Sequence, residues 1–373
     1  MIEQQKEKRN QGLIGLRGFL VLTTALGFHY AMLYGTVPAT GTFGKKLFDI
    51  FYLFGLTAPN IFLIMSGYFM YHKYRKRIRQ GLGFGEYILP RIKKIYPLMI
   101  FFTVYLFAVE NIGKLQLGFY PLHADGGELR YSVRSLIVSI LGIQSGLFAE
   151  GDTMAVNGPA WFVTTLLLCY SLFFVIVRFC KNQKTEWSLY LILGLLGVVF
   201  TFHPVHAPLL YECSARGWFF FFAGVIMHIV TDITGEKRRN LRIGFAAGLM
   251  VFCIAAAVII HYNDFTVWQT YLAWPCLVYL IIDCPVLQKV FAFPPLVWVG
   301  ERSMSVFLGN LPILTTFAWL NLRYGWEADY GSWRVWIVLF AVTLLVGQLT
   351  YVVFEKWIPS LIGFPQNRKN QRD

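Results

Sequence analysis

The sequence predicts an all-α, polytopic membrane protein: a helical bundle of about ten transmembrane helices with both termini in the cytoplasm. Mean hydropathy is +0.54, and 56% of the 373 residues are hydrophobic. Only 14% of the residues are charged, well below the roughly 25% typical of soluble domains. Basic residues gather between alternate apolar stretches, as the positive-inside rule describes for membrane proteins.

Ten apolar stretches are candidate spans, because a helix needs about 17 to 25 such residues to cross the hydrocarbon core. They are Gly12–Tyr34, Asp49–Tyr71, Tyr96–Val109, Trp161–Arg178, Trp187–Phe202, Trp218–Ile233, Ile243–Ile260, Val267–Ile282, Met304–Leu320 and Val335–Phe354. The third is short and is expected to begin before Tyr96. The first is too long for a cleavable signal peptide, so we expect it to be retained. Residues 1–373 are expected to form one membrane domain with no appended soluble domain.

The basic residues predict the orientation. Placing the N-terminus in the cytoplasm assigns 25 of the 33 Lys and Arg residues to the inner side and 8 to the outer side. The net charge of +13 is then explained by topology and by contact with anionic membrane lipid. We therefore expect no nucleic-acid partner. The expected location is a plasma membrane, namely the cytoplasmic membrane of a bacterium, which the chain crosses several times.

Two connections are longer than the others. The stretch from His72 to Ile95 is predicted to be a basic inner loop, with glycines at 81, 83 and 85 that let the chain turn back. The outer stretch runs from Glu110 to Ala160 and contains an apolar but interrupted segment, Val133–Phe148. We expect this segment to be a re-entrant or interfacial helix packed on the bundle, because irregular backbone at membrane depth must be covered by protein.

Arg17 and His29 lie within the first predicted span, where an ionisable side chain is costly and usually functional. Twelve residues of helix separate them by roughly 18 Å, so one lies near each face of the bilayer. Arg17 is either an interfacial arginine that reaches lipid phosphate or a fixed cation that binds a substrate entering from the cytoplasm; its depth favours the second. His29 is either a packed core residue or a general base, since its unperturbed pKa of about 6.5 suits proton transfer.

Three further groups of polar residues are candidates for sites. Arg91, Lys93 and Lys94 lie between two prolines at the mouth of the third span and could bind a phosphate-rich ligand; the earlier cluster at 73–79 is interpreted as topology alone. Asn310 precedes Pro312 and is expected to break a span, where it could line a polar cavity or bond across helices. The histidines at 203 and 206 with the glutamate at 212 suggest a metal site, but the prolines at 204 and 208 keep that loop extended, so we expect no metal.

Several segments together resemble the integral-membrane acyltransferases known as acyltransferase type three. The similarity runs in order through almost the whole chain. The matching segments are Leu16-Arg17-Gly18 with His29, Asn60–Phe69 with its Ser66-Gly67-Tyr68, Leu89–Pro97 ending in Tyr96-Pro97, Pro159-Ala160-Trp161-Phe162, and Leu296–Ser303.

This resemblance implies a function. Members transfer an acyl group, usually acetyl from cytoplasmic acetyl-CoA, to a hydroxyl of an extracytoplasmic glycan or glycolipid. By resemblance Arg17 would hold the donor and His29 would act at the acyl transfer, either directly or through an acyl-His29 intermediate. The remaining expected site residues are Ser66, Arg91, Lys93, Lys94 and Tyr96 at the donor, and Trp161 and Asn310 at the acceptor. Acetyl-CoA is expected as the acyl donor, without a metal, and a separate extracytoplasmic partner could complete delivery.

The chain departs from the family pattern at two points. Members usually have ten residues between the arginine and the histidine, which brings both to one helix face. This chain has eleven, Gly18 to Phe28, and in a regular helix the extra residue turns His29 about 100° away. Either a bulge near Gly27 restores the shared face, or His29 is not the equivalent base. In addition, Asn310 stands where many members carry a histidine.

Two other functions fit the same composition. A transporter or flippase could move a lipid-linked or acyl substrate without bond-making, and an inactive bundle could serve as a scaffold. Intramembrane charge predicts transport and catalysis equally, but the sequence shows no inverted repeat or paired broken helices of the kind seen in many transporters. The acyltransferase hypothesis expects Arg17 and His29 to share one continuous cavity.

Overall fold

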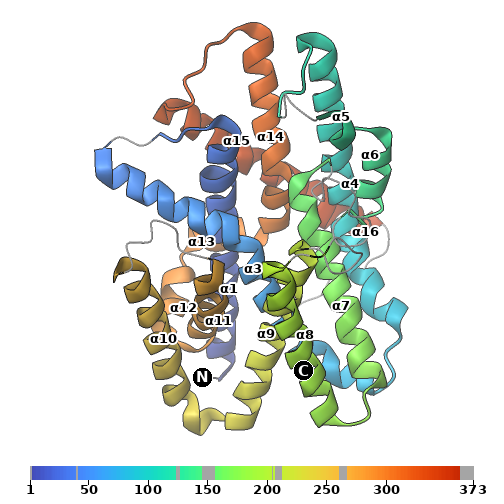
Figure 1. Cartoon of the computed structure of the whole chain (residues 1–373), viewed down its shortest axis with the longest axis vertical. Helices are drawn as coiled ribbons and strands as arrows, with labels where there is room; N and C mark the ends of the chain where they lie inside the picture. The colour runs from blue at the N-terminus through green and yellow to red at the C-terminus, as the bar shows by residue number, and fades with distance from the viewer. Residues whose placement is uncertain are drawn as a thin grey trace.

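The computed structural model confirms an all-helical membrane bundle (Figure 1). It describes residues 2–38, 41–122, 127–144, 156–203, 205, 212–259 and 267–361. Within these ranges there is no strand, and 9 helices are long and apolar enough to cross a membrane. A bent pair, Gln269–Asp283 and Pro285–Phe291, whose halves meet at 93°, brings the number up to 10 when it is counted as one span. The prediction of about ten spans is therefore confirmed.

The chain forms sixteen α-helices and four short helical segments of other geometry, of which η1 and η4 are π-helical and η2 and η3 are 3-10 turns. In chain order they are α1 (Ile2–Thr23), η1 (Thr24–His29), α2 (Tyr30–Tyr34), α3 (Gly41–Arg79), α4 (Phe84–Leu117), α5 (Gly127–Arg130), α6 (Val133–Ile140), η2 (Gly158–Ala160), α7 (Trp161–Phe179), α8 (Gln183–Phe202), α9 (Glu212–Thr234), η3 (Glu236–Arg238), α10 (Arg239–Ile259), α11 (Val267–Asp283), α12 (Pro285–Phe291), α13 (Pro294–Glu301), α14 (Ser303–Tyr324), α15 (Trp333–Thr350), η4 (Tyr351–Trp357) and α16 (Ile358–Leu361), within the described ranges. The first span thus consists of α1, η1 and α2.

The predicted inner loop from His72 to Ile95 is wrong in its extent. Helix α3 continues to Arg79 and α4 begins at Phe84, so only residues 80–83 connect them. The turn uses Gly81, whose φ of +106° is open only to glycine at low cost. The lysines and arginines of this stretch are good helix formers, and they extend both helices beyond the hydrocarbon instead of forming a loop.

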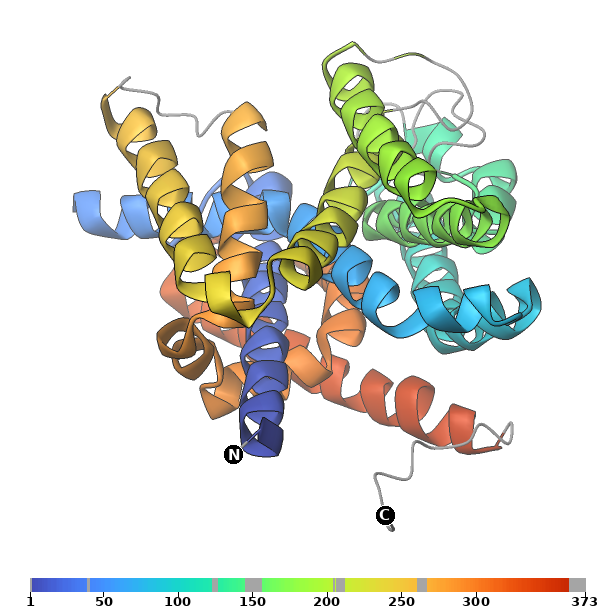
Figure 2. The same cartoon turned by 90° about the horizontal axis from the view of Figure 1, so that it is seen from below.

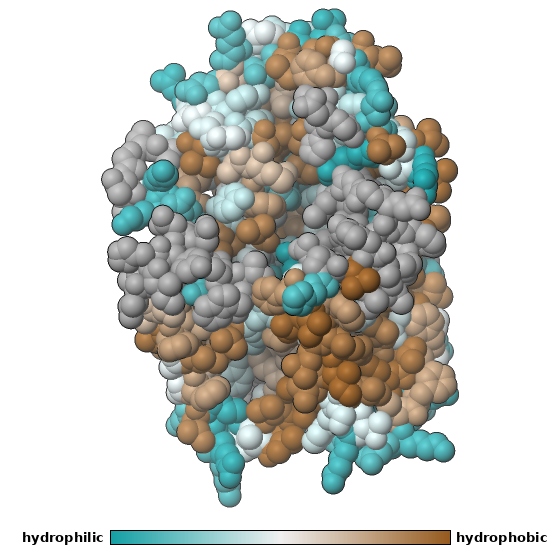
Figure 3. Space-filling view, in the orientation of Figure 1, coloured by the Kyte–Doolittle hydropathy of each residue, from teal (hydrophilic) through white to brown (hydrophobic). Residues whose placement is uncertain are grey.

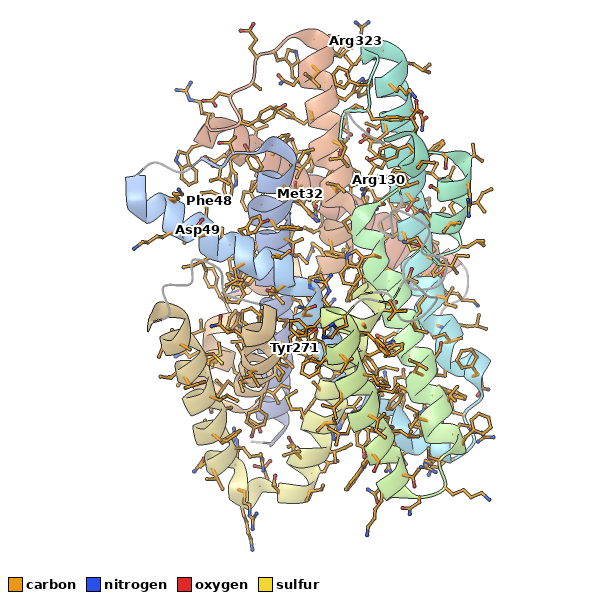
Figure 4. The ribbon with its side chains drawn as sticks, viewed as in Figure 1. Met32, Phe48, Asp49, Arg130, Tyr271 and Arg323 are labelled. Carbon is orange, nitrogen blue, oxygen red and sulfur yellow. The ribbon has the colours of Figure 1, made fainter. Side chains whose placement is uncertain are left out.

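Basic residues lie at both ends of the bundle. The α7–α8 and α9–α10 turns and the start of α1 lie at the lower end in Figure 1, and the second of these turns carries Lys237, Arg238 and Arg239. Arg323 lies at the opposite end (Figure 4). The surface in Figure 3 shows a brown apolar region in its lower half, bordered below by teal hydrophilic side chains. Seen from below, α1 lies among the other helices (Figure 2), in contact with α3, α11, α12 and α13.

Glycines let two pairs of helices come into backbone contact. A Cβ added at Gly67 would lie 1.9 Å from the carbonyl oxygen of Phe221, and one at Gly224 would lie 2.0 Å from that of Ile64. These reciprocal contacts hold α3 against α9, in the manner of small-residue packing in membranes. A Cβ at Gly18 would likewise lie 2.0 Å from the Leu296 carbonyl oxygen. The first span is thereby fixed close to α13 and to the start of α14.

The basic cluster at the end of α3 has a structural partner. Glu186 of α8 is fully buried and accepts hydrogen bonds from Arg75 Nε at 2.8 Å and Arg79 Nη2 at 2.6 Å. The Tyr190 hydroxyl donates to the same carboxylate at 2.9 Å. A buried carboxylate needs such partners, so these two arginines serve the α3–α8 contact and not a ligand.

The long outer stretch contains the expected surface segment. Helix α6 begins at Val133, as predicted, and its 8 residues are too few to cross a bilayer. The chain after it is covered by the bundle: the Tyr96 hydroxyl donates to the Leu141 carbonyl at 3.0 Å, and the Thr164 hydroxyl donates to the Gly142 carbonyl at 2.8 Å. The end of the predicted segment, residues 145–148, lies outside the described residues.

Candidate functional site

The first span changes its helical geometry between Arg17 and His29. Residues Thr24–His29 form the π-helix η1, which accommodates one extra residue without ending the helix. Arg17 Nη2 donates to the Ser303 hydroxyl at 2.6 Å, and His29 Nδ1 lies 2.5 Å from Asn310 Oδ1. Ser303 and Asn310 are two turns apart on one face of α14. The bulge predicted near Gly27 is therefore present, and both ionisable residues of the first span face the same helix.

Neighbouring helices fill the openings that the π-helix creates. The Trp336 indole N–H donates to the Leu26 carbonyl at 3.1 Å. The Thr24 hydroxyl lies 3.2 Å from the carbonyl oxygen of Gly55 in α3. That oxygen would normally accept from residue 59, which is a proline and has no N–H. The same hydroxyl is 2.8 Å from the Leu20 carbonyl, so it is shared between its own helix and the carbonyl that the proline leaves open. Thr24 and Pro59 both lie beside His29.

The hydrogen bonds of Asn310 fix the protonation of His29. Asn310 Nδ2 donates to the carbonyl oxygens of Val306 at 3.2 Å and Phe307 at 3.0 Å. Because carbonyls only accept, the amide nitrogen must face them, and its oxygen must face the imidazole. His29 Nδ1 therefore carries the proton in the neutral ring, and Nε2 keeps its lone pair. The residue is only 7% exposed, so burial and this hydrogen bond fix the orientation of the ring.

An inner cavity of about 600 Å³ contains most of the predicted donor residues. Its polar lining comprises Arg17, Ser66, Tyr74, Arg91, Lys94, Tyr170, Ser303 and Glu355. The guanidinium of Arg91 lies 4.3 Å from the ring centroids of Tyr74 and Tyr87 and 5.2 Å from that of Tyr170. These cation–π contacts hold one cation of the cavity in place.

Two of the predicted donor residues do not line this cavity. Lys93 is exposed, and Tyr96 lies under the chain after α6, where its hydroxyl bonds Leu141. Helical periodicity accounts for the difference, because Arg91 and Lys94 are three residues apart and share a face, whereas Lys93 points to another side.

A smaller outer cavity of about 180 Å³ contains His29. Trp161, predicted to contact the acceptor, lines it, as do Thr24 and Met32. Two arginines that the sequence did not single out also line it, Arg130 of α5 and Arg216 of α9. Figure 4 labels Met32 and Arg130 in the upper half of the bundle. The cavity thus combines a base, an aromatic surface and two cations.

Phe307 lines both cavities and marks their boundary. Its ring centroid lies 6.3 Å from that of Phe62 and 5.7 Å from that of Phe162, and these two lie 6.0 Å apart. The expectation of one continuous cavity is therefore not met. Arg17 lines the inner cavity and His29 the outer one, with an aromatic trio, Phe62, Phe162 and Phe307, between them.

Asn310 does not break its span, contrary to the prediction. Helix α14 runs from Ser303 to Tyr324 through Pro312. The carbonyl of Leu308, left open by that proline, accepts from Asn157 Nδ2 at 3.2 Å. Asn310 itself is fully buried and is not among the residues that line either cavity. It bonds across helices to His29, which is the second of the two uses expected for it.

Glu355 is a site residue that the sequence analysis missed. It lies in the second π-helix, η4, and lines the inner cavity. Its Oε1 accepts from the Ser305 hydroxyl at 2.9 Å, and it is within electrostatic reach of Lys94 and Arg17. A glutamate directly after the last predicted span, which ends at Phe354, was the available signal.

No group of three potential metal ligands occurs among the described residues. His203 belongs to the described part of the chain, whereas His206 lies outside it. The site residues described above, a histidine, four arginines, a lysine and one glutamate, are instead typical of anion binding and proton transfer.

The family comparison agrees with this architecture. A family model described as an acyltransferase domain, acyltransferase 3, matches residues 10–352. The match includes Arg17, His29 and all but the end of the last span. No curated protein and no solved structure matches the chain. Since the match extends over nearly the whole sequence and over its apolar helices, the chain is a multi-pass membrane protein of the acyltransferase 3 family.

Proposed function

We propose that the protein transfers an acetyl group from cytoplasmic acetyl-CoA to a hydroxyl of an extracytoplasmic glycan or glycolipid. In this proposal Arg17 holds the donor, His29 is the general base, and the protein works in the cytoplasmic membrane of a bacterium. One observation carries the proposal: the π-helix turns both residues toward α14, and Asn310 leaves Nε2 of His29 as the basic nitrogen. Without that bulge the two side chains would face different neighbours.

The inner cavity suits the donor. Its cations, Arg17, Arg91 and Lys94, match the phosphate groups of a coenzyme A thioester. Because the guanidinium of Arg91 is already held by three tyrosine rings, little side-chain freedom is lost when it binds phosphate. Methionine and phenylalanine side chains line the rest of the cavity and suit the long pantetheine arm.

The reaction needs one base close to the reacting atoms. His29 Nε2 accepts the proton of the acceptor hydroxyl while the hydroxyl oxygen attacks the thioester carbonyl carbon. The tetrahedral intermediate then collapses, the carbon–sulfur bond breaks, and the leaving thiolate takes the proton from the imidazolium. The products are an acetyl ester and the thiol form of coenzyme A. Asn310 acts as a positioning residue, because it orients the ring but carries no charge to balance the imidazolium.

Phe307 has to move for the two substrates to meet. It lies between the cavity with Arg17 and the cavity with His29, so the thioester reaches the base only when this ring turns aside. With the ring in place, water from the outer cavity is kept from the donor, which limits hydrolysis of the thioester before an acceptor arrives.

Isotope transfer tests the proposal. Membranes that contain the protein would receive acetyl-CoA labelled in the acetyl group, together with envelope glycan as the acceptor. We expect base-labile label on the glycan, and we expect it to be lost in His29→Ala and Arg17→Ala. Full transfer by both variants would contradict the proposed site. Movement of intact substrate without transfer would favour a transporter or flippase, and neither transfer nor movement would favour a scaffold.

A further inference from the structure

The basic residues near the end of α3 fall into two sets on different faces of the helix. Arg75 and Arg79 bind the buried carboxylate of Glu186 and so hold α3 against α8. Lys73 and Arg77 are also four residues apart, which places them together on another face, and both are exposed. The α8 contact therefore accounts for the first set only, and the second set needs a separate explanation.

The second set lies at one end of the inner cavity. Tyr74 is the last cavity-lining residue along α3, and Pro90 is the first along α4. These two are therefore the lining residues closest in sequence to the α3–α4 turn at residues 80–83, and the basic residues around that turn place it at the cytoplasmic face. We call this end of the cavity its mouth.

Three cations contact the Tyr74 ring at this mouth. The ring centroid lies 5.4 Å from Lys73 Nζ and 5.3 Å from the guanidinium of Arg77. The guanidinium of Arg91, which lines the cavity, lies 4.3 Å from the same centroid. Such contacts restrain the cations, and among the described residues none of the three forms a salt bridge with an acidic side chain. Since like charges held close together repel, an anion bound at this point would be stabilised.

These cations extend a row that includes Arg17. Arg17 is within electrostatic reach of Tyr170, and the ring centroid of Tyr170 lies 5.2 Å from the guanidinium of Arg91. From Arg91 the row continues through the Tyr74 ring to Arg77. An elongated ligand with several anionic groups could therefore meet a cation at successive points along the cavity.

We infer that Lys73 and Arg77, together with Arg91, bind the 3′-phosphate of coenzyme A at the mouth of the inner cavity. This inference rests on the proposed function and extends the donor site beyond the residues that line the cavity. Coenzyme A carries its 3′-phosphate on the ribose, at the opposite end of the molecule from the thioester. Because the proposed reaction directs the thioester toward His29, the nucleotide end is left at the mouth. A phosphate monoester brings a charge of about −1.5 to −2 to these cations.

The phosphate of an anionic lipid in the inner leaflet is a second possible source of the same chemistry. The position of the cations favours the donor, because Arg91 lines the cavity and so does the Tyr74 ring that all three cations contact. A lipid phosphate can bind exposed basic residues anywhere on this face of the protein, whereas the 3′-phosphate of the donor is presented only at the mouth. The two sources therefore differ in which substitutions affect binding.

Two ligands that differ only in the 3′-phosphate test the inference. Coenzyme A and dephospho-coenzyme A would be titrated into the purified full-length chain in nanodiscs of zwitterionic lipid, and calorimetry gives both dissociation constants. We expect the wild type to bind coenzyme A at least about tenfold more tightly, as charge-assisted hydrogen bonds allow. The double variant Lys73→Gln/Arg77→Gln should lose most of this factor, while its affinity for dephospho-coenzyme A stays unchanged.

A matched substitution and a change of lipid are the controls. Lys237→Gln removes an exposed lysine from η3, in the α9–α10 turn at the lower end of Figure 1, and it should leave the ratio of the two constants unchanged. A ratio near one in the wild type, an unchanged ratio in the double variant, or an equal weakening of both ligands there would overturn the inference. Loss of the wild-type ratio when phosphatidylglycerol is added to the nanodiscs would overturn it too, because lipid phosphate would then hold the site.

Transfer of labelled acetyl keeps the inference distinct from the proposed function. In that assay the double variant should raise the KM for acetyl-CoA, leave kcat unchanged and leave both constants for acetyl-dephospho-CoA unchanged. Transfer by the wild type with the same KM for both donors would overturn the inference and leave the acyltransferase proposal intact. A preference for coenzyme A in binding, without transfer from either donor, would support the inference and count against the proposed function.

Discussion

The inner and outer cavities are built in different ways around the same helix, α14. The inner cavity, about 600 Å³, is formed mostly by long helices, and Glu355 of the π-helix η4 lies beside its three cations. The outer cavity, about 180 Å³, depends on local departures from regular structure: the π-helix η1, the 3-10 turn η2 and the four-residue helix α5. Under the proposed function, donor binding would use charges that membrane topology already places near the cytoplasm, whereas the reacting end would need backbone geometry made for one side chain.

The comparison is tested most strongly by His29→Ala. If the outer cavity does the chemistry and the inner one only binds, kcat should fall by about 10²- to 10⁴-fold, the usual contribution of a general base. The KM for acetyl-CoA should stay within about twofold, because the side chain lies in the other cavity. Steady-state transfer assays measure both constants. A comparable rise in KM would show that the division between the cavities is wrong.

Arg17→Ala should have the opposite signature. Loss of a charged hydrogen-bond donor at the inner cavity should raise the KM for acetyl-CoA by about 10- to 100-fold. Arg17→Lys should have a smaller effect, because it keeps the charge and loses only the paired N–H donors of the guanidinium. The matched control is Lys93→Ala, since Lys93 is exposed and lies on another face of α4. If Lys93→Ala weakened the donor as much as Arg17→Ala, the assignment of the inner cavity would not hold.

Asn310→Ala should show how far the orientation of His29 matters. We expect kcat to fall by about tenfold, the value of one lost hydrogen bond at a buried polar group, with the KM for the donor unchanged. The ¹⁵N spectrum of labelled histidine provides a second measurement: the wild-type ring should carry its proton on Nδ1, and the variant should show a mixture of tautomers. An unchanged spectrum would mean that Asn310 does not fix the ring.

Phe307→Leu should give the smallest effect. It tests whether the ring of Phe307 separates the two cavities. The substitution keeps an apolar side chain at the contact with Phe62 and Phe162 but removes the ring. We expect release of acetate from acetyl-CoA in the absence of acceptor to rise several-fold, while transfer with acceptor changes little. Thermal unfolding of the variant provides the folding control. If acetate release stayed at the wild-type level, Phe307 would not be the barrier to water.

Local features of the sequence predicted the spans and most of the inner cavity. Hydropathy and basic clusters depend on neighbouring residues, so the ten spans, Arg17 and Arg91 could be found without a structure. The residue count between Arg17 and His29 left two alternatives, a bulge near Gly27 or a different base, and the structure contains the bulge. Lys93 need not have been placed among the donor residues, since helical periodicity already puts it on a different face of the helix from Arg91 and Lys94.

The outer cavity could not be predicted in the same way. His29 meets Asn310 across 281 positions of sequence, and the trio at Phe307 joins three different spans. Such contacts depend on the packing of whole helices. Arg130 and Arg216 were indistinguishable from other outer basic residues until the structure brought them to one cavity with His29.

The π-helix in the first span also bears on how members of this family are compared. This chain has one residue more between Arg17 and His29 than the family pattern implies, and the wide turn η1 accommodates it while both side chains contact α14. The distance in sequence between the cation and the base is then free to vary by one, while their arrangement in space is kept. Relatives with ten or eleven intervening residues can therefore be aligned on the helix that receives both side chains, and deleting one residue from η1 would convert one arrangement into the other.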